Sequence, residues 1–270
     1  MPELPEVETT RRGIEPWLVG AAVTDFAVHQ RQLRWPVPEA LDALVGARVR
    51  AVTRRAKYLL IDTLPGTAIV HLGMSGSLRV YRGDEALRKH DHVDLKLDNG
   101  HGLRFHDPRR FGSWLWQAAG APLHPRLASL GPEPFEAAFS PTRLFERSRG
   151  SKAPVKTFIM NNATVVGVGN IYASEALYRA GVRPGRAAGR VTRREYAALH
   201  EAIVTVLQAA IQQGGTTLRD FLNSDGEPGY FAQSLNVYGR AGEPCHRCGS
   251  TVSSRVIGQR STFWCRECQR

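Results

Sequence analysis

The C-terminal end of the chain contains all four of its cysteines, arranged as two Cys-x-x-Cys pairs. Cys245 and Cys248 form the first pair, Cys265 and Cys268 form the second, and sixteen residues separate the pairs. Each pair directs two thiolates toward one point, so two pairs at this spacing complete the closed tetrahedral shell of a structural zinc site. A redox-active dithiol is the alternative, but it needs one such pair and not two. We therefore expect one structural Zn²⁺ on a C-terminal zinc-ribbon β-hairpin.

The preceding sequence predicts a β-rich region followed by a helical one. Short runs of β-forming residues, separated by turn residues, cover 22–28, 48–53, 58–62, 68–72, 77–81, 92–97, 102–106 and 113–117. Strands this short and closely spaced are typical of a β-sandwich, because a parallel sheet would need helices between them. An apolar stripe over residues 6–18 predicts a flanking helix in front of the sandwich.

A Pro- and Gly-rich stretch, 120–134, separates the strands from the helical region. One helix is expected over 169–180, and a second runs from Thr192, where Glu195 supplies a capping box, to Gly214. Residues 214–242 are expected to form a loop. The chain is thus predicted to be α+β, with domains over 1–131, 132–235 and 236–270.

Positive charge indicates a polyanionic partner. The chain has 36 Lys and Arg against 25 Asp and Glu, a net charge of +11, and only five of the basic residues are lysines. Arginine suits phosphate groups and base edges, although a basic enzyme without a nucleic-acid partner has the same balance. No apolar run is long enough to span a membrane, and the acidic, proline-interrupted N-terminus is unlike a secretory signal. We expect a cytoplasmic protein.

The first residues offer a nucleophile and an acid. Removal of Met1 would leave Pro2 as a secondary amine, which attacks a sugar C1′ to form an iminium that retains its positive charge. Glu3 could protonate the ring oxygen during that attack, and Glu6 could order this cluster or cap the following helix. The alternative is that Pro-Glu simply begins a helix.

Three further segments carry side chains suited to DNA. Lys57 lies in a cationic strand turn and could neutralise a phosphate beside the sugar. Met74, Arg109 and Phe111 lie in Gly- and Pro-containing loops, where they could form a wedge in an opened base stack. Asn170 follows two glycines at the start of a helix, where backbone N–H groups can approach a phosphate. A solvated strand end and ordinary packing are the alternatives for the first two segments.

Together these segments resemble the bacterial formamidopyrimidine-DNA glycosylases, bifunctional repair enzymes for 8-oxoguanine and ring-opened purines. The resemblance extends over nearly the whole chain and rests on residues 2–8, 54–59, 71–76, 90–92, 107–112, 166–175 and 214–233 and on the cysteine module. It implies excision of the oxidised base from double-stranded DNA, a Schiff base at the N-terminal proline, and strand cleavage by β,δ-elimination. It also implies a monomer that works in the cytoplasm and associates with the nucleoid when on DNA.

The resemblance also implies roles for individual residues. Pro2 would be the nucleophile, Glu3 the proton donor at the sugar, Lys57 a proton donor in β-elimination, and Arg260 a proton donor and phosphate ligand in δ-elimination. Residues 216–230 would form a loop that caps the lesion. The residues implied to bind DNA are His90, Arg109, Lys152 and Asn170 through phosphates, and Met74, Arg109 and Phe111 through the base stack, with Arg109 facing the orphaned cytosine.

Two other functions remain open from the sequence. An endonuclease VIII-type enzyme for oxidised pyrimidines shares the Pro-Glu start, but we would then expect different residues in place of the run from Asp107 to Phe111. A zinc-ribbon DNA-binding regulator without catalysis would share the basic charge and the cysteines. Such a regulator would tolerate a retained Met1, whereas the enzyme would lose its lyase activity.

Overall fold

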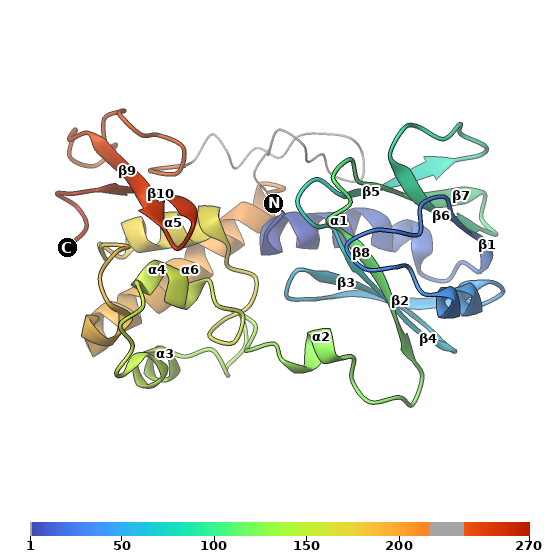
Figure 1. The fold of residues 1–270 in the computed structure, drawn as a ribbon, viewed down its shortest axis with the longest axis horizontal. Helices are drawn as coiled ribbons and strands as arrows, with labels where there is room; N and C mark the ends of the chain where they lie inside the picture. The colour runs from blue at the N-terminus through green and yellow to red at the C-terminus, as the bar shows by residue number, and fades with distance from the viewer. Residues whose placement is uncertain (1, 216–234) are drawn as a thin grey trace. The chain divides into compact units, whose positions relative to one another are not determined.

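The computed structural model describes residues 2–215 and 235–270, and its α+β architecture confirms the predicted fold class (Figure 1). The described residues form two compact units. We call residues 2–128 with 213–215 the sandwich unit, and 129–212 with 235–270 the helical unit. Met1 and the predicted lesion-capping loop, 216–230, lie outside the described residues.

The sandwich unit contains two four-stranded antiparallel sheets. The first has the order β1 (Val23–Val28), β6 (Asp91–Leu97), β7 (His101–His106), β5 (Ser77–Arg82), and the second has the order β2 (Val49–Arg55), β3 (Tyr58–Thr63), β4 (Gly66–His71), β8 (Ser113–Ala118). All eight predicted strands are present. Alternate side chains of both sheets share one apolar core, which includes Leu59, Ile61, Val70, Val93, Leu95, Leu103, Phe105 and Trp114.

Helix α1 (Leu4–Leu18) packs against the edge strands of both sheets, β2 and β5. Its buried apolar residues, Val7, Ile14 and Leu18, belong to the core of the sandwich. An exposed strand edge presents unpaired backbone groups, so a helix laid against it protects the sheet. Because α1 begins only a few residues into the chain, this packing fixes the position of the N-terminal residues relative to β2.

The helical unit is built around α6 (Arg193–Gln212), which packs against α5 (Asn170–Arg179) and α3 (Pro141–Ser148). Both long predicted helices are confirmed, and Thr192 and Glu195 form the expected capping contacts through the Thr192 N–H and hydroxyl. The sequence analysis missed α3, α4 (Val155–Ile159), the four-residue α2 (Pro125–Ala128) and the 3₁₀ turns η1 (Glu39–Leu44) and η2 (Ala188–Arg190). Within the described ranges, no helix has both the length and the apolar character needed to span a membrane.

The cysteine module contains a hairpin of β9 (Val252–Ile257) and β10 (Arg260–Cys265). A two-residue turn with positive φ at both Gly258 (56°) and Gln259 (60°) joins the strands, as the twist of a tight hairpin requires. Strand β10 packs against α5, so the hairpin belongs to the same compact unit as the helices.

Candidate functional site

The N-terminal residues are held by the start of α1. Glu3 is the N-cap residue, and it forms a capping box with Glu6 in which the Glu3 N–H donates to Glu6 Oε2 at 2.8 Å. Pro2, Glu3 and Glu6 are all buried. Glu6 therefore caps the helix, which was one of the two roles expected for it. The capping box thus fixes the backbone of Glu3, the residue that follows the one that would carry the nucleophilic amine.

Arg54 connects this helix to the turn that carries Lys57. Its Nε donates to Glu8 of α1 at 3.2 Å, and its Nη1 donates to the carbonyl of Ala56 at 3.0 Å. Burial alone would raise the pKa of Glu8. Hydrogen bonds from Arg11 and Arg12 and the charge of Arg54 outweigh this effect, so the pKa of Glu8 is lowered from its usual value. A charged Glu8 thus ties α1 to the β2–β3 turn.

Lys57 occupies the second position of the two-residue β2–β3 turn and is buried. The first position, Ala56, has a left-handed backbone with φ of 54°, which residues with a Cβ seldom adopt. The ring of His71, at the end of β4, contacts the ring of Tyr58 in a tilted arrangement, with 4.9 Å between centroids. Burial, assisted by the charges of Lys57 and Arg34, lowers the pKa of His71 to about 4. The imidazole of His71 is therefore neutral at pH 7.

The structure brings Met74, Arg109 and Phe111 onto two loops in direct contact. An added Cβ at Gly73 would lie 2.4 Å from the backbone nitrogen of Gly112, so the two loop backbones approach as closely as glycine allows. Phe111 is 42% exposed, and the Arg109 guanidinium lies 5.0 Å from its ring centroid. An exposed phenylalanine beside a cation suits a base stack better than a protein core.

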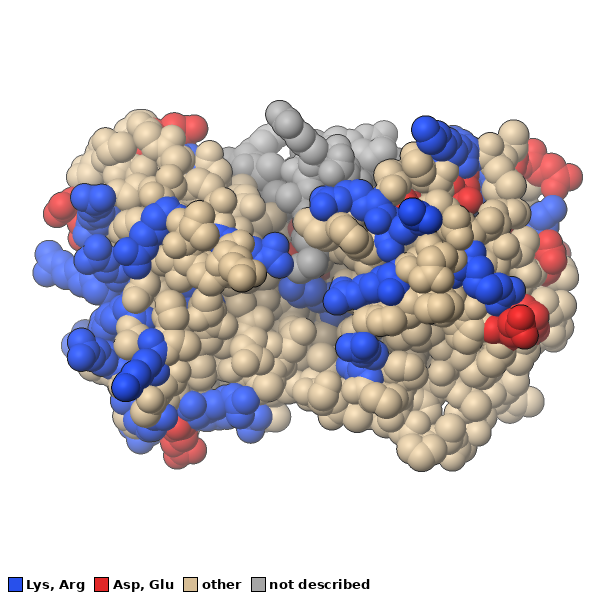
Figure 2. Space-filling model, in the orientation of Figure 1, with Lys and Arg blue, Asp and Glu red and all other residues tan. Residues whose placement is uncertain are grey.

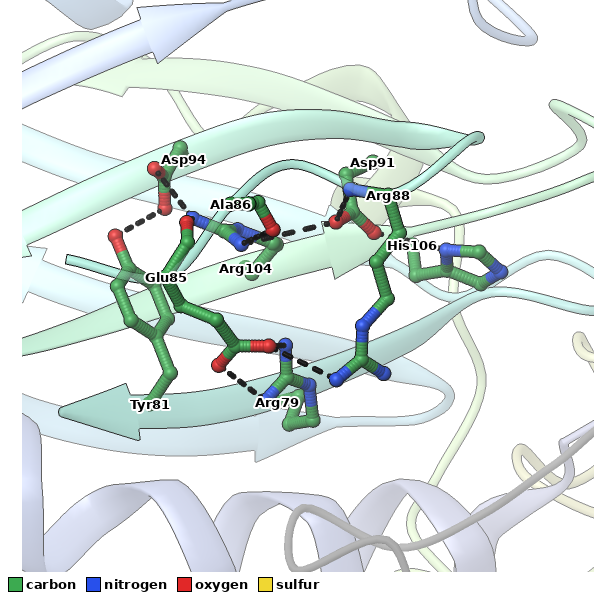
Figure 3. A network of polar contacts seen from close by, with 9 residues as sticks. All are labelled: Arg79, Tyr81, Glu85, Ala86, Arg88, Asp91, Asp94, Arg104 and His106. Carbon is green, nitrogen blue, oxygen red and sulfur yellow. Dashed lines mark hydrogen bonds and ion pairs between the residues drawn. The ribbon is translucent and has the colours of Figure 1, made fainter.

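His90 adopts a left-handed conformation (φ 76°) just before β6, and a polar network around the buried Arg104 holds the segment in front of it (Figure 3). Arg104 donates to the carbonyl oxygens of Glu85 and Ala86, at 3.0 and 3.1 Å, and lies 3.8 Å from Asp91. Because one buried guanidinium fixes both the segment and the residue after His90, the backbone of His90 is closely constrained.

In the helical unit, Asn170 is hydrogen-bonded to the hairpin of β9 and β10, next to Arg260. We call this hairpin the zinc hairpin. Asn170 Nδ2 donates to the Ser261 carbonyl at 3.0 Å. Lys156, which is 0% exposed, donates to Asn170 Oδ1 at 2.6 Å and to Thr262 Oγ1 at 2.8 Å. The side chain of Arg260 itself is exposed. Two predicted phosphate-binding residues, Asn170 and Arg260, thus lie in one neighbourhood.

Sequence reasoning missed Lys156, which forms the centre of this neighbourhood. The scarcity of lysine among the basic residues was the one available signal, since the partners of Lys156 lie far along the chain. Lys152, a predicted DNA contact, is exposed on the segment between α3 and α4. An exposed lysine is compatible with a phosphate contact.

The four cysteine Sγ atoms lie within 4.8 Å of one another. The Sγ–Sγ distances are 3.9 Å for Cys245–Cys268 and 3.4 Å for Cys248–Cys265. Tetrahedral zinc with Zn–S bonds of about 2.3 Å requires sulfur separations of about 3.8 Å, so the cluster fits this ion. Burial and the neighbouring thiols raise the pKa of Cys265 and Cys268, whereas hydrogen bonds lower the pKa of Cys245 and Cys248, and a bound cation would favour the thiolate form of all four. The cluster therefore holds one structural Zn²⁺.

Three segments match models of known domain families. Residues 1–114 match the formamidopyrimidine-DNA glycosylase N-terminal domain, residues 130–222 its H2TH domain, and residues 242–270 the zinc finger found in FPG and IleRS. The chain belongs to the formamidopyrimidine-DNA glycosylase family. This finding confirms the resemblance drawn from the sequence and makes the chain a DNA glycosylase, which excludes the non-catalytic regulator.

Full-length relatives agree with this assignment. The formamidopyrimidine-DNA glycosylases of Alcanivorax borkumensis and Stenotrophomonas maltophilia strain R551-3 are 60% and 59% identical over 270 and 271 residues, with complete coverage of both sequences. The MutM (Fpg) protein of Thermus thermophilus is 38% identical with a TM-score of 0.89, covering 99% of this chain and 98% of that one. Lactococcus lactis Fpg, in a complex with abasic-site DNA, is 32% identical with a TM-score of 0.91 and 99% coverage of each chain.

Basic side chains dominate the surface drawn in Figure 2. In each unit of this glycosylase, blue Lys and Arg atoms cover far more of the visible face than red Asp and Glu atoms. In the sandwich unit, Arg34 and Arg126 both lie over the ring of Trp35, at 4.7 and 4.1 Å from its centroid. The net charge is thus displayed on the surface, where a phosphate backbone can reach it.

Proposed function

We propose that this glycosylase excises oxidised purines, 8-oxoguanine and formamidopyrimidines, from duplex DNA and then cleaves the strand at the resulting abasic site. The observation that carries the proposal is the capping box at the start of α1, which fixes Glu3, the residue next to the buried Pro2. The family assignment and the complexes of Lactococcus lactis Fpg with abasic-site DNA and with N7-benzyl-Fapy-dG DNA support the substrate class.

The first step joins protein and sugar. The secondary amine of Pro2, freed by removal of Met1, attacks C1′ while the bond between C1′ and the base breaks. The base departs with the bonding electron pair, and the proton that the attacking nitrogen loses neutralises it. Glu3 donates its proton to the ring oxygen, so the sugar opens and the nitrogen lone pair forms an iminium with C1′. The iminium retains a positive charge and serves as the electron sink for the steps that follow.

Both steps of strand cleavage use the iminium as their electron sink. Loss of a C2′ proton expels the 3′ phosphate in β-elimination, with Lys57 as proton donor. A second loss of a proton, at C4′, expels the 5′ phosphate in δ-elimination, with Arg260 as proton donor and phosphate ligand. Asn170, His90, Arg109 and Lys152 bind phosphates of the backbone. The zinc ion supplies no chemistry to the sugar and acts only by holding the hairpin that carries Arg260.

Extrusion of the damaged nucleotide precedes the chemistry. Flipping a base costs a few kcal/mol of stacking and pairing, and less for a damaged base, which gives one source of selectivity. Met74, Arg109 and Phe111 fill the vacated space and recover part of that cost. The exposure of Phe111 and the Arg109 contact on its ring support this role, and Arg109 is the residue proposed to face the orphaned cytosine.

Borohydride trapping tests the proposal. The protein is incubated with duplex containing 8-oxoguanine opposite cytosine, the imine is reduced, and the adduct is mapped by peptide mass spectrometry. We expect a covalent link at Pro2, lost when a non-removable residue precedes Pro2 and kept in the matched proline variant Pro5→Ala. The absence of any adduct, or an adduct on Lys57 alone, would overturn the mechanism.

A further inference from the structure

A single buried carboxylate joins the two loops that carry the proposed wedge. Asp107, immediately after β7, is 0% exposed. Its Oδ1 accepts a hydrogen bond from the Ser75 hydroxyl at 2.8 Å, and its Oδ2 accepts one from the Gly112 N–H at 2.8 Å. Ser75 follows Met74 directly, and Gly112 follows Phe111. Each oxygen of Asp107 thus fixes a neighbour of a wedge residue.

The backbone of Asp107 makes three further connections. Its N–H donates to the carbonyl of His90 at 3.0 Å, and its carbonyl accepts from the N–H of Arg110 at 3.2 Å. His92 Nε2 also lies 2.8 Å from that carbonyl, and because a carbonyl only accepts, Nε2 carries the proton. Asp107 therefore also ties the wedge loops to the segment of the proposed phosphate ligand His90.

Glycines bring the same loops into backbone contact. Gly73, with φ of 70°, would place a Cβ 2.4 Å from the nitrogen of Gly112. Gly112 would place its own Cβ 2.5 Å from the Phe105 ring and 2.8 Å from the carbonyl oxygen of His71. No side chain fits at Gly73 without moving the loop backbone of Phe111 and Gly112, and none fits at Gly112 without moving the Phe105 ring or the end of β4. The two loops therefore form one packed body, with Asp107 at its centre.

We propose that Asp107 is a positioning residue that holds Met74, Arg109 and Phe111 as one preformed wedge before DNA arrives. The inference rests on the proposed function, because it takes these three residues to fill the opened base stack. Ordering two loops on binding would consume interaction energy, whereas loops that are already ordered leave that energy for base extrusion. Asp107 acts through the loops and does not touch the sugar.

The test separates extrusion from sugar chemistry. Single-turnover excision is measured on 8-oxoguanine opposite cytosine, and strand cleavage is measured on a duplex with a preformed abasic site, which has no base to extrude. We expect Asp107→Ala to slow excision at least about tenfold, equivalent to about 1.4 kcal/mol. Abasic-site cleavage should change much less. Asp107→Asn should retain most activity, because its amide can accept from Gly112 and donate to the Ser75 oxygen.

A second readout does not depend on DNA. Amide hydrogen exchange at Gly112 should accelerate in the DNA-free Asp107→Ala variant. It should not accelerate in Thr63→Ala, the control. That substitution removes a different buried hydrogen bond of the sandwich, from the Thr63 hydroxyl to the Gly66 carbonyl at 2.6 Å. Ser75→Ala removes one of the two hydrogen bonds to the Asp107 carboxylate and should give an intermediate loss of excision. This variant tests the inference even if Asp107→Ala does not fold.

Three outcomes would overturn the inference. These are equal losses of excision and abasic-site cleavage, an Asp107→Asn variant as slow as Asp107→Ala, and unchanged exchange at Gly112. Failure of the underlying wedge function has a different signature. In that case Met74→Ala and Phe111→Ala would excise 8-oxoguanine as fast as the parent protein, whatever Asp107 does.

Discussion

At the scale of single residues, Glu3 has two roles that can be separated. Its backbone and side chain belong to the capping box of α1, and its carboxyl group is the proposed acid at the sugar ring oxygen. Glutamine keeps an oxygen that can accept the capping hydrogen bond but has no acidic proton. Substitution at this position therefore tests the chemistry while leaving the helix start intact.

We expect Glu3→Gln to slow excision of 8-oxoguanine by about 10²-fold or more, the usual contribution of a general acid. The free energy of unfolding should change little. Single-turnover excision and urea unfolding measure the two effects, and Glu15→Gln, near the other end of α1, is the matched control. A Glu3→Gln variant with parental excision would remove Glu3 from the mechanism.

The neutral state of His71 makes stability depend on pH. In the unfolded chain this imidazole has its ordinary pKa of 6.5, but in the folded protein the pKa is lowered to about 4. Acidification between these values therefore stabilises the unfolded state, and stability present above pH 6.5 is lost on the way down to pH 4.

Replacing His71 by asparagine should reduce this pH dependence. The loss of unfolding free energy between about pH 7 and about pH 5 should be smaller by about 1–2 kcal/mol in His71→Asn. Asparagine can still accept the hydrogen bond that the Gly73 N–H donates to His71 Nδ1 at 2.9 Å. Urea titrations at the two pH values measure the free energy of unfolding of each protein. An equal loss between the two pH values in both proteins would assign the pH dependence to other groups.

The residues that sequence analysis could and could not find differ in how their partners are spaced. Cys245 and Cys248 are three positions apart, so their shared role can be read from local spacing. Lys156 contacts Thr262, 106 positions away, and Asp107 contacts Ser75, 32 positions away. Only the folded chain brings such partners together, and no local pattern distinguishes these residues from other charged side chains.

At the scale of elements, the zinc hairpin determines the position of Arg260. Its tip packs on α4, since a Cβ at Gly258 would lie 2.3 Å from Thr157 Cγ2, and its other end is fixed by the cysteine cluster. Arg260 lies between these two anchors as the first residue of β10. Removal of the metal frees the cysteine end and leaves Arg260 without a fixed position.

We expect chelation of the zinc ion to weaken binding to duplex DNA at least about tenfold, because metal binding and folding of such modules are coupled. The sandwich unit should remain folded, with its N-terminal amine unaltered. Fluorescence anisotropy reports the affinity, and hydrogen exchange over β1–β8 reports the sandwich. Unchanged affinity after metal analysis has confirmed zinc loss would contradict the dependence on the hairpin.

The elements themselves were predictable in proportion to their length and periodicity. The strands of the sandwich are short runs of β-forming residues between clear turn signals, and the 20-residue helix α6 carries a buried stripe from Tyr196 to Ala210. Helix α3 has a capping serine, whose Ser140 Oγ accepts from Arg143 N–H, but buries only Leu144 and Ser148 of its eight residues. Helix α4 spans five residues, too few for a helical period to appear.

At the scale of the whole molecule, the charge of +11 sets how binding responds to salt. Each phosphate neutralised on duplex DNA contributes a slope of about −0.9 to the logarithm of affinity against the logarithm of salt concentration. Four cationic side chains are proposed to lie at phosphates or the sugar: Lys57, Arg109, Lys152 and Arg260. Binding to duplex DNA should therefore weaken steeply as salt is added.

We expect a slope of about −4 on undamaged duplex and a reduction of about one in Arg260→Gln. Arg50→Gln, which removes an exposed arginine paired with Asp62 at 2.8 Å, should leave the slope unchanged. Anisotropy titrations over a range of potassium chloride concentrations provide the measurement. A slope near zero would mean that contacts other than charged ones dominate the affinity.

The turn that carries Lys57 also bears on engineering. Ala56 holds a left-handed conformation that costs a residue with a Cβ about 1–2 kcal/mol, and glycine would adopt it without that cost. Ala56→Gly is therefore the substitution that a search for heat-resistant variants would select. The same glycine would widen the range of positions open to the neighbouring ammonium group. Loss of the Ala56 methyl group would then raise thermostability and lower turnover.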